Sequence, residues 1–145
     1  MSSSEFFEGG SSASAAGQPS ASKPADTGQL DFEIDFFEAI LSIEPEYVDV
    51  LRCQGELLTR KGLHKRAVEV DRRLARLQPD DCVVHYNFAC SLAQGNHARE
   101  AIDELRKAFE RGYDDFSYLE TDSDLDNIRE KPEFKALLKE FWLDA

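Results

Sequence analysis

Helix-ending residues recur at a fixed interval along this chain, and this repeat constrains the fold more than any other feature. Pro45 and Pro79 are 34 residues apart. The same interval of 34 separates the members of four further pairs, which are Gly55/Ala89, Leu58/Leu92, Gly62/Asn96 and Ala67/Ala101. Proline and glycine end helices, and no stretch shows the sustained alternation that is typical of a strand. A period of 34, built from two helices and tight turns, predicts an all-α fold of stacked antiparallel helical hairpins.

Small residues within the repeat indicate where the helices of a hairpin approach each other. Gly55 and Ala89 occur where the first helix has to lie close to its partner, and Ala67 and Ala101 occur at the matching place on the second helix. Large apolar residues fill the space between the helices; these are Leu58, Leu74, Leu92 and Leu105.

Composition and the repeat divide the chain into a tail and one helical domain. Residues 1–27 are mostly Ser, Ala, Gly and Pro, with too few large apolar groups to offset the entropy of ordering, which predicts a disordered tail. Within this tail, Phe6 and Phe7 are either a small docking motif or a chance aromatic pair. The predicted domain covers residues 28–145, with a half repeat at 28–47, full repeats at 48–81 and 82–115, and a capping segment at 116–145.

The two full units resemble the tetratricopeptide repeat (TPR) family. They read "VDVLRCQGELLTRKGLHKRAVEVDRRLARLQPDD" and "CVVHYNFACSLAQGNHAREAIDELRKAFERGYDD". Where the family usually has an aromatic residue in the first helix, the units have Leu51 and His85. Where it has Phe in the second helix, they have Asp71 and Leu105. The resemblance implies an α-solenoid that acts as a non-enzymatic scaffold or adaptor and binds another protein.

The resemblance also implies a concave groove lined by the first helix of each hairpin. The predicted groove residues are Arg52, Glu56, Tyr86, Asn87 and Cys90. Asn87 matches the family asparagine that holds a peptide backbone, and Arg52 stands where clamp members of the family carry lysine. Glu56 replaces the second clamp asparagine, so we expect a peptide other than a chaperone tail. A solvated concave surface without a ligand is the alternative.

The helix predicted within 31–44 has no partner on its amino-terminal side. The residues before it contain Gly17, Pro19 and Pro24 and almost no large apolar side chain. The helix nevertheless has apolar residues on two sides. Phe37, Ile40 and Leu41 are predicted to face the next hairpin, and Phe32, Phe36 and Ile43 point elsewhere. Covering each of these side chains contributes roughly 1.5–3 kcal/mol, so we expect a second copy of the chain, a partner protein, or Phe6 and Phe7 to cover them.

The closing segment allows a second function. Its sequence "FSYLETDSDLDNIREKPEFKALLKEF" resembles the end of certain TPR arrays, with an apolar stripe in its last helix. Residues 122–133 also space three aspartates and Glu133 as in an EF-hand calcium loop. Asn127 in place of the turn glycine, Arg129 in place of an apolar residue, and Pro132 oppose a calcium loop. The alternative interpretation is that these aspartates cap helices.

The rest of the sequence argues against other classes of function. The net charge of −12 disfavours nucleic acid and anionic membrane surfaces as partners. No run of roughly 18 apolar residues and no secretory signal is visible. Three cysteines without a C-x-x-C spacing favour a reducing compartment, so we expect a cytoplasmic protein. No nucleophile–base arrangement or phosphate-binding loop is evident, and we expect no catalysis, no cofactor and no metal site.

Overall fold

The computed structural model describes residues 27–142, and this part of the chain is all-helical, with no strand. The predicted tail lies outside the described residues, together with Phe6 and Phe7, except that Thr27 already belongs to the first helix. The helices are α2 (Thr27–Ile43), α3 (Val48–Lys61), α4 (His64–Leu77), α5 (Cys82–Gln94), α6 (Ala98–Glu110), α7 (Phe116–Thr121) and α8 (Pro132–Phe141), with a 3-10 turn η4 (Ser123–Leu125) before α8.

The helices end where the sequence predicts breaks. Gly62 follows α3 with φ +87°, and Gly112 follows α6 with φ +107°, both in the left-handed region that glycine adopts without strain. Asn96, 34 residues after Gly62, also has a positive φ of 67°. Asparagine is one of the few other residues that enters this region readily.

The turn after α3 is repeated after α5 with the same hydrogen bonds. The Leu63 N–H donates to the Leu58 carbonyl at 2.9 Å, and the His97 N–H donates to the Leu92 carbonyl at 2.9 Å. Each bond satisfies a carbonyl that the end of the helix would leave unpaired. The 34-residue period in sequence therefore corresponds to a repeated backbone structure at these two turns.

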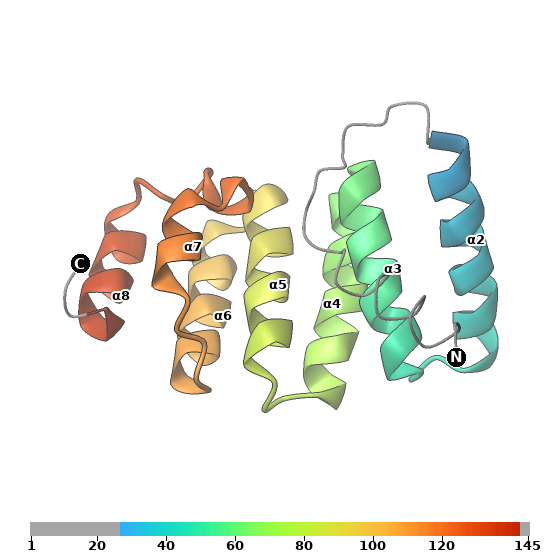
Figure 1. Cartoon of the computed structure of the whole chain (residues 1–145), viewed down its shortest axis with the longest axis horizontal. Helices are drawn as coiled ribbons and strands as arrows, with labels where there is room; N and C mark the ends of the chain where they lie inside the picture. Colours follow the sequence, from blue (N-terminus) through green and yellow to red (C-terminus); the bar gives the residue numbers. More distant parts are fainter. Residues whose placement is uncertain (1–26, 143–145) are drawn as a thin grey trace, which may run out of the picture.

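Helices α2 to α6 pack successively side by side, and α8 stands at the far end of the row (Figure 1). Contacts join α2 to α3, α3 to α4, α4 to α5, and α5 to α6. The 3-10 turn η4 packs against α5, and α8 packs against α6. The core runs along the row, and its largest fully buried apolar side chains are Leu51, Leu58, Leu92, Leu105, Leu119, Leu125, Ile128, Phe134 and Leu137.

The small residues of the repeat lie at close helix contacts, as predicted. Ala67, Ala89 and Ala101 are completely buried. Gly55 on α3 is the tightest of these positions, because a Cβ atom there would lie 2.5 Å from Oδ1 of Asp71 on α4.

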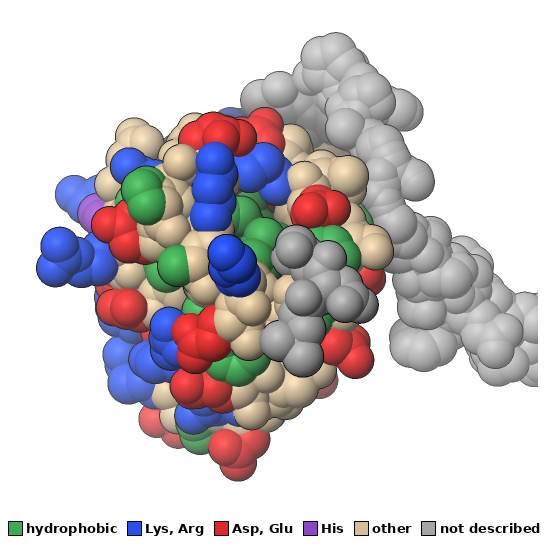
Figure 2. Space-filling view, turned by 90° about the vertical axis from the view of Figure 1, so that its left-hand side faces the viewer, with side chains coloured by type: hydrophobic (Ala, Val, Ile, Leu, Met, Phe, Trp, Pro, Cys, Tyr) green, Lys and Arg blue, Asp and Glu red, His purple; other side chains and the backbone are tan. Residues whose placement is uncertain are grey.

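The two ends of the row differ in surface chemistry. At the end formed by α8, Phe134 and Leu137 point inward and are buried. The outward positions of α8 carry Glu133, Lys135, Lys139 and Glu140, and charged side chains of both signs cover much of this end (Figure 2). None of the helices within residues 27–142 is long and apolar enough to cross a bilayer.

Candidate functional site

Helix α2, at the other end of the row, is apolar on two opposite sides. Its inner side places Ile34 (3% exposed) and Leu41 (8% exposed) in the core against α3. Its outer side exposes Phe32 by 65%, Phe36 by 53% and Ile43 by 80%. These are the three side chains that the sequence predicts to point away from the next hairpin.

The exposed side chains form one continuous stripe. Exposed Ala39 fills the gap between Phe36 and Ile43, and the spacing of Phe32, Phe36, Ala39 and Ile43 follows the helical period. We call these four residues the α2 outer face. The rings of Phe32 and Phe36 stack with centroids 6.4 Å apart and an interplanar angle of 14°. An ordered pair of exposed aromatic rings is a feature of protein-binding surfaces.

The acidic residues of α2 lie mostly beside the outer face and toward α3 and α4. Asp31 forms an ion pair with Lys61, and Glu38 accepts hydrogen bonds from Arg66 at 3.1 Å and from Gln54. Asp35 is exposed and forms no ion pair with any residue between 27 and 142. The helix contains four acidic residues and no lysine or arginine, so its own side chains carry only negative charge.

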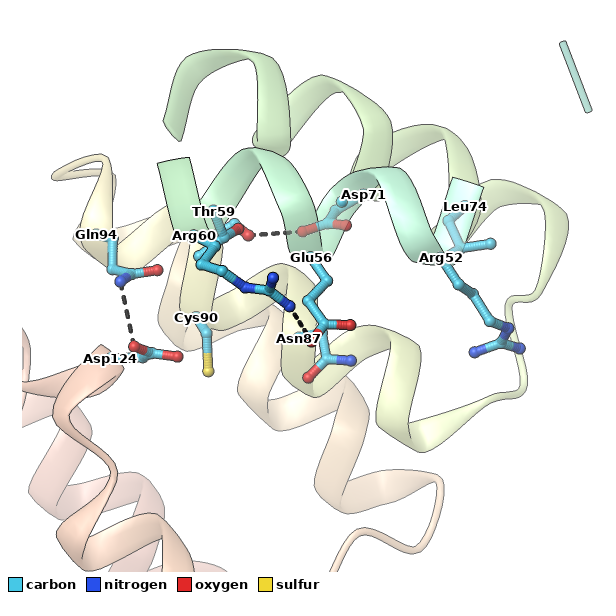
Figure 3. A pocket seen from close by; sticks show the side chains of 12 residues that line it. Arg52, Glu56, Thr59, Arg60, Asp71, Leu74, Asn87, Cys90, Gln94 and Asp124 are labelled. Atoms are coloured by element: carbon cyan, nitrogen blue, oxygen red, sulfur yellow. Dashed lines mark hydrogen bonds and ion pairs between the residues drawn. The ribbon is translucent and has the colours of Figure 1, made fainter. Parts of the chain in front are cut away.

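A cavity of about 550 Å³ opens between α3, α4, α5 and η4 (Figure 3). It brings together four of the five predicted groove residues, which are Arg52, Glu56, Asn87 and Cys90. Arg52 lies at one end of the cavity in Figure 3, and Gln94 and Asp124 lie at the other.

Both arginines of the cavity already have partners. Arg52 forms an ion pair with Asp81 at 2.9 Å, and Asp81 also caps α5 by accepting the N–H groups of Val83 and Val84. Arg60 lies 3.4 Å from Glu56 one turn earlier on α3, as Figure 3 shows. These pairs are partly exposed, so a ligand can exchange with them at low energetic cost.

The fifth predicted groove residue, Tyr86, does not line the cavity. It is only 4% exposed, its ring stacks on Tyr113 with centroids 4.3 Å apart, and its hydroxyl donates a hydrogen bond to Asp122. Burial raises the pKa of Tyr86, and the nearby Cys90 and Asp122 raise it further. Tyr86 therefore lies outside the lining of this cavity, because Tyr113, Tyr118 and Asp122 cover it.

Asp71, which in the sequence is only a departure from the TPR pattern, lies in the lining of the cavity. Asp71 is buried and accepts a hydrogen bond from Ser91 Oγ at 2.6 Å. Burial raises the pKa of this carboxyl to about 7, against the weaker lowering effect of Ser91. Its carboxylate occupies the space left by the missing Cβ of Gly55. The sequence offered one sign of this contact, which is the presence of Gly55 on α3 and of an acid, Asp71, on α4.

The possible calcium ligands are not brought together as an EF-hand loop requires. Asp122 caps η4 by accepting the Asp124 N–H at 3.0 Å, and Asp126 pairs with Arg129 at 3.1 Å. The ligand atoms of Asp122 and Asp124 lie within 4.8 Å of each other and of Cys90, and this group does not include Asp126. Glu133 is exposed on α8 and is also outside it. The capping interpretation of Asp122 is confirmed.

The fold and these two surfaces define an all-α protein with an uncovered apolar helix at one end and a polar cavity in its middle. No family model matches the chain. A stretch of 91 residues is 29% identical to a protein of Arabidopsis thaliana that is named as chloroplastic. The match covers 61% of this chain and 27% of the Arabidopsis protein, so the similarity concerns about a quarter of that protein.

Proposed function

We propose that this chain is a non-enzymatic scaffold or adaptor that binds another protein through a short TPR-like α-solenoid. The support for the solenoid is the recurrence of one turn, with the same hydrogen bonds, after α3 and after α5. In this proposal the chain has about two full repeats, a half repeat formed by α2, and a cap formed by α8. A stack of this kind presents helix surfaces for recognition.

The observation that carries the proposal is the α2 outer face. Helices in stacked arrays bury both sides, and terminal helices usually have a polar outer side. Helix α8 follows this rule, whereas α2 exposes Phe32, Phe36 and Ile43. Large aromatic and aliphatic side chains exposed in one stripe indicate a binding surface, because apolar residues on an ordinary protein surface are scattered singly.

The cavity is a second surface for a short peptide in the same function. Asn87 and Arg52 are exposed or half-exposed at its edge and offer hydrogen bonds to an extended backbone. The net charge of −12 favours a protein or peptide partner over nucleic acid or an anionic membrane. Calcium binding by residues 122–133 has no comparable support. A cytoplasmic location stays a prediction, since the similar Arabidopsis protein is named as chloroplastic.

Affinity capture from a lysate of the source organism, followed by mass spectrometry, tests this proposal when matched variants are compared. Phe36→Ser removes a ring that is 53% exposed on α2, and Tyr118→Ser removes a ring that is 53% exposed on α7. We expect Phe36→Ser to lose the specific partner and Tyr118→Ser to keep it. The double variant Arg52→Glu and Asn87→Ala tests in the same capture whether the partner binds in the cavity.

The proposal fails if every specific partner remains bound to all of these variants. Circular dichroism of each variant controls for folding. The substituted side chains on α2 and α7 are already half exposed, so their removal leaves the core intact.

A further inference from the structure

The position beside α2 has the dimensions of one more helix. From Phe32 to Ile43 the α2 outer face extends about 16 Å along the helix axis, which corresponds to three turns. Its residues recur at intervals of four, three and four, which is the pattern that a second helix lying alongside would contact. Helices α3 to α6 each have a helix packed on both sides, whereas α2 packs chiefly against α3 among the described elements.

The charge beside the α2 outer face indicates which kind of partner can bind there. On a helical projection Asp35 lies directly next to the Phe32–Phe36 stripe, with Asp31 and Glu38 further round the same side. Asp31 and Glu38 are engaged by Lys61 and Arg66, and Glu33 accepts a hydrogen bond from Gln29 at 2.8 Å. This leaves Asp35 to face a partner. A lysine or arginine on the partner would meet it at the edge of the apolar contact.

A second copy of the chain fits this face poorly. Two α2 helices laid against each other would bring the unpaired Asp35 side chains to one contact, and α2 supplies no lysine or arginine to meet them. Each copy also carries a net charge of −12. Like charges across an interface are destabilising and suppress the wrong partner.

The chain's own amino-terminal segment has the same disadvantage. Phe6 and Phe7 are flanked by Glu5 and Glu8, and the segment up to residue 26 contains a single basic residue, Lys23. Its apolar residues would therefore arrive at α2 together with charges of the wrong sign.

We propose that the α2 outer face binds a basic amphipathic helix of a partner protein, with its apolar stripe on Phe32, Phe36 and Ile43 and a lysine or arginine beside Asp35. This inference rests on the proposed function and specifies the partner's chemistry. The bound helix would extend the row beyond α2.

Three fluorescent helical peptides of equal length test the inference by anisotropy with the full chain. The first carries leucines at positions i, i+4, i+7 and i+11 with lysines beside them. The second keeps the leucines and replaces the lysines by glutamates. The third has the composition of the first with its leucines spread around the helix. We expect the first peptide to bind at least tenfold more tightly than either of the others at low salt, which corresponds to about 1.4 kcal/mol.

Variants of the chain locate the bound peptide. Phe36→Ser should weaken binding of the first peptide about tenfold, and Tyr118→Ser should leave it unchanged. Asp35→Lys should reduce or reverse the preference for lysine over glutamate, and raising the salt concentration should shrink that preference because both charges are exposed.

Several outcomes would overturn the inference. Equal binding of the lysine and glutamate peptides would contradict the role of charge. Equal binding of the first and third peptides would contradict the role of the apolar stripe. A dimer in light scattering that Phe36→Glu dissociates would identify a second copy as the occupant. A tenfold gain in peptide affinity on changing Phe6 and Phe7 to serine would identify the amino-terminal segment instead. If no peptide binds while capture still depends on Phe36, the partner chemistry is wrong and the proposed function stands.

Discussion

Replacing Gly55 by alanine tests how tightly α3 and α4 are fitted together. The added Cβ would lie 2.5 Å from Asp71 Oδ1 and 3.5 Å from its Cγ. An ordinary contact needs about 1 Å more, so either the carboxyl group or the helices have to move. The carboxyl group has little freedom, because it is buried and its other oxygen accepts a hydrogen bond from Ser91 Oγ at 2.6 Å.

Two opposing effects set the magnitude. Alanine is better than glycine in a helix interior by about 1 kcal/mol. Overpacking a fitted contact destabilises by about 1–3 kcal/mol, and loss of the Ser91 hydrogen bond adds about 1 kcal/mol. We therefore expect Gly55→Ala to lower the free energy of unfolding by about 1–3 kcal/mol, although alanine favours the helix.

A double-mutant cycle with Asp71→Ala separates these effects. In the Asp71→Ala background the obstructing carboxyl group is gone, and Gly55→Ala should raise the free energy of unfolding by up to about 1 kcal/mol through helix propensity. The expected coupling between the two positions is about 2 kcal/mol or more. Urea unfolding followed by circular dichroism gives all four free energies, with the slope of each transition checking that the unfolded state is unchanged.

The reasoning is refuted if Gly55→Ala stabilises the unmodified chain. It is also refuted if the two substitutions are additive within about 0.5 kcal/mol, because the carboxyl group would then not be the obstacle.

Two further predictions concern the acidic side chains. Because burial raises the pKa of Asp71 from 3.8 to about 7, folding favours its protonated form. Its stabilising contribution is complete below about pH 4 and is lost as the pH rises to 7, by up to about 4 kcal/mol. Asp71→Asn should therefore gain stability relative to the unmodified chain over that interval in urea unfolding at a series of pH values, and a difference independent of pH would contradict this. Millimolar Ca²⁺ should leave the melting temperature unchanged, because Asp122 already accepts hydrogen bonds from Tyr86 and Asp124; a saturable rise would restore the calcium hypothesis.

The parts of the structure that depend on local chemistry could be predicted from the sequence. Glycine, proline and asparagine act on their own backbone, so the helix ends at Gly62 and Asn96 followed from residue type and spacing. The exposed side of α2 was predictable for the same reason, since helical periodicity alone places Phe32 and Phe36 away from Leu41.

The lining of the cavity could be predicted only in part, because it depends on contacts between distant segments. Tyr86 lies on the same helix as Asn87, but Tyr113 stacks on its ring and Asp122, 36 residues later, accepts its hydroxyl, so it is covered. In the sequence, Asp71 is an acid at a position where the TPR pattern has Phe. Its place in the cavity could not be predicted, because it depends on the missing side chain of Gly55 and the hydroxyl of Ser91. Such pairings require the relative rotation of helices, which a 34-residue period does not specify.

The contrast between a charged α8 end and an apolar α2 end gives the molecule a direction. A chain with adhesive helices at both ends would polymerise, adding subunits head to tail without limit. On the proposed docking through α2, a complex that recruits this protein would present the charged α8 end at that position in place of an apolar helix.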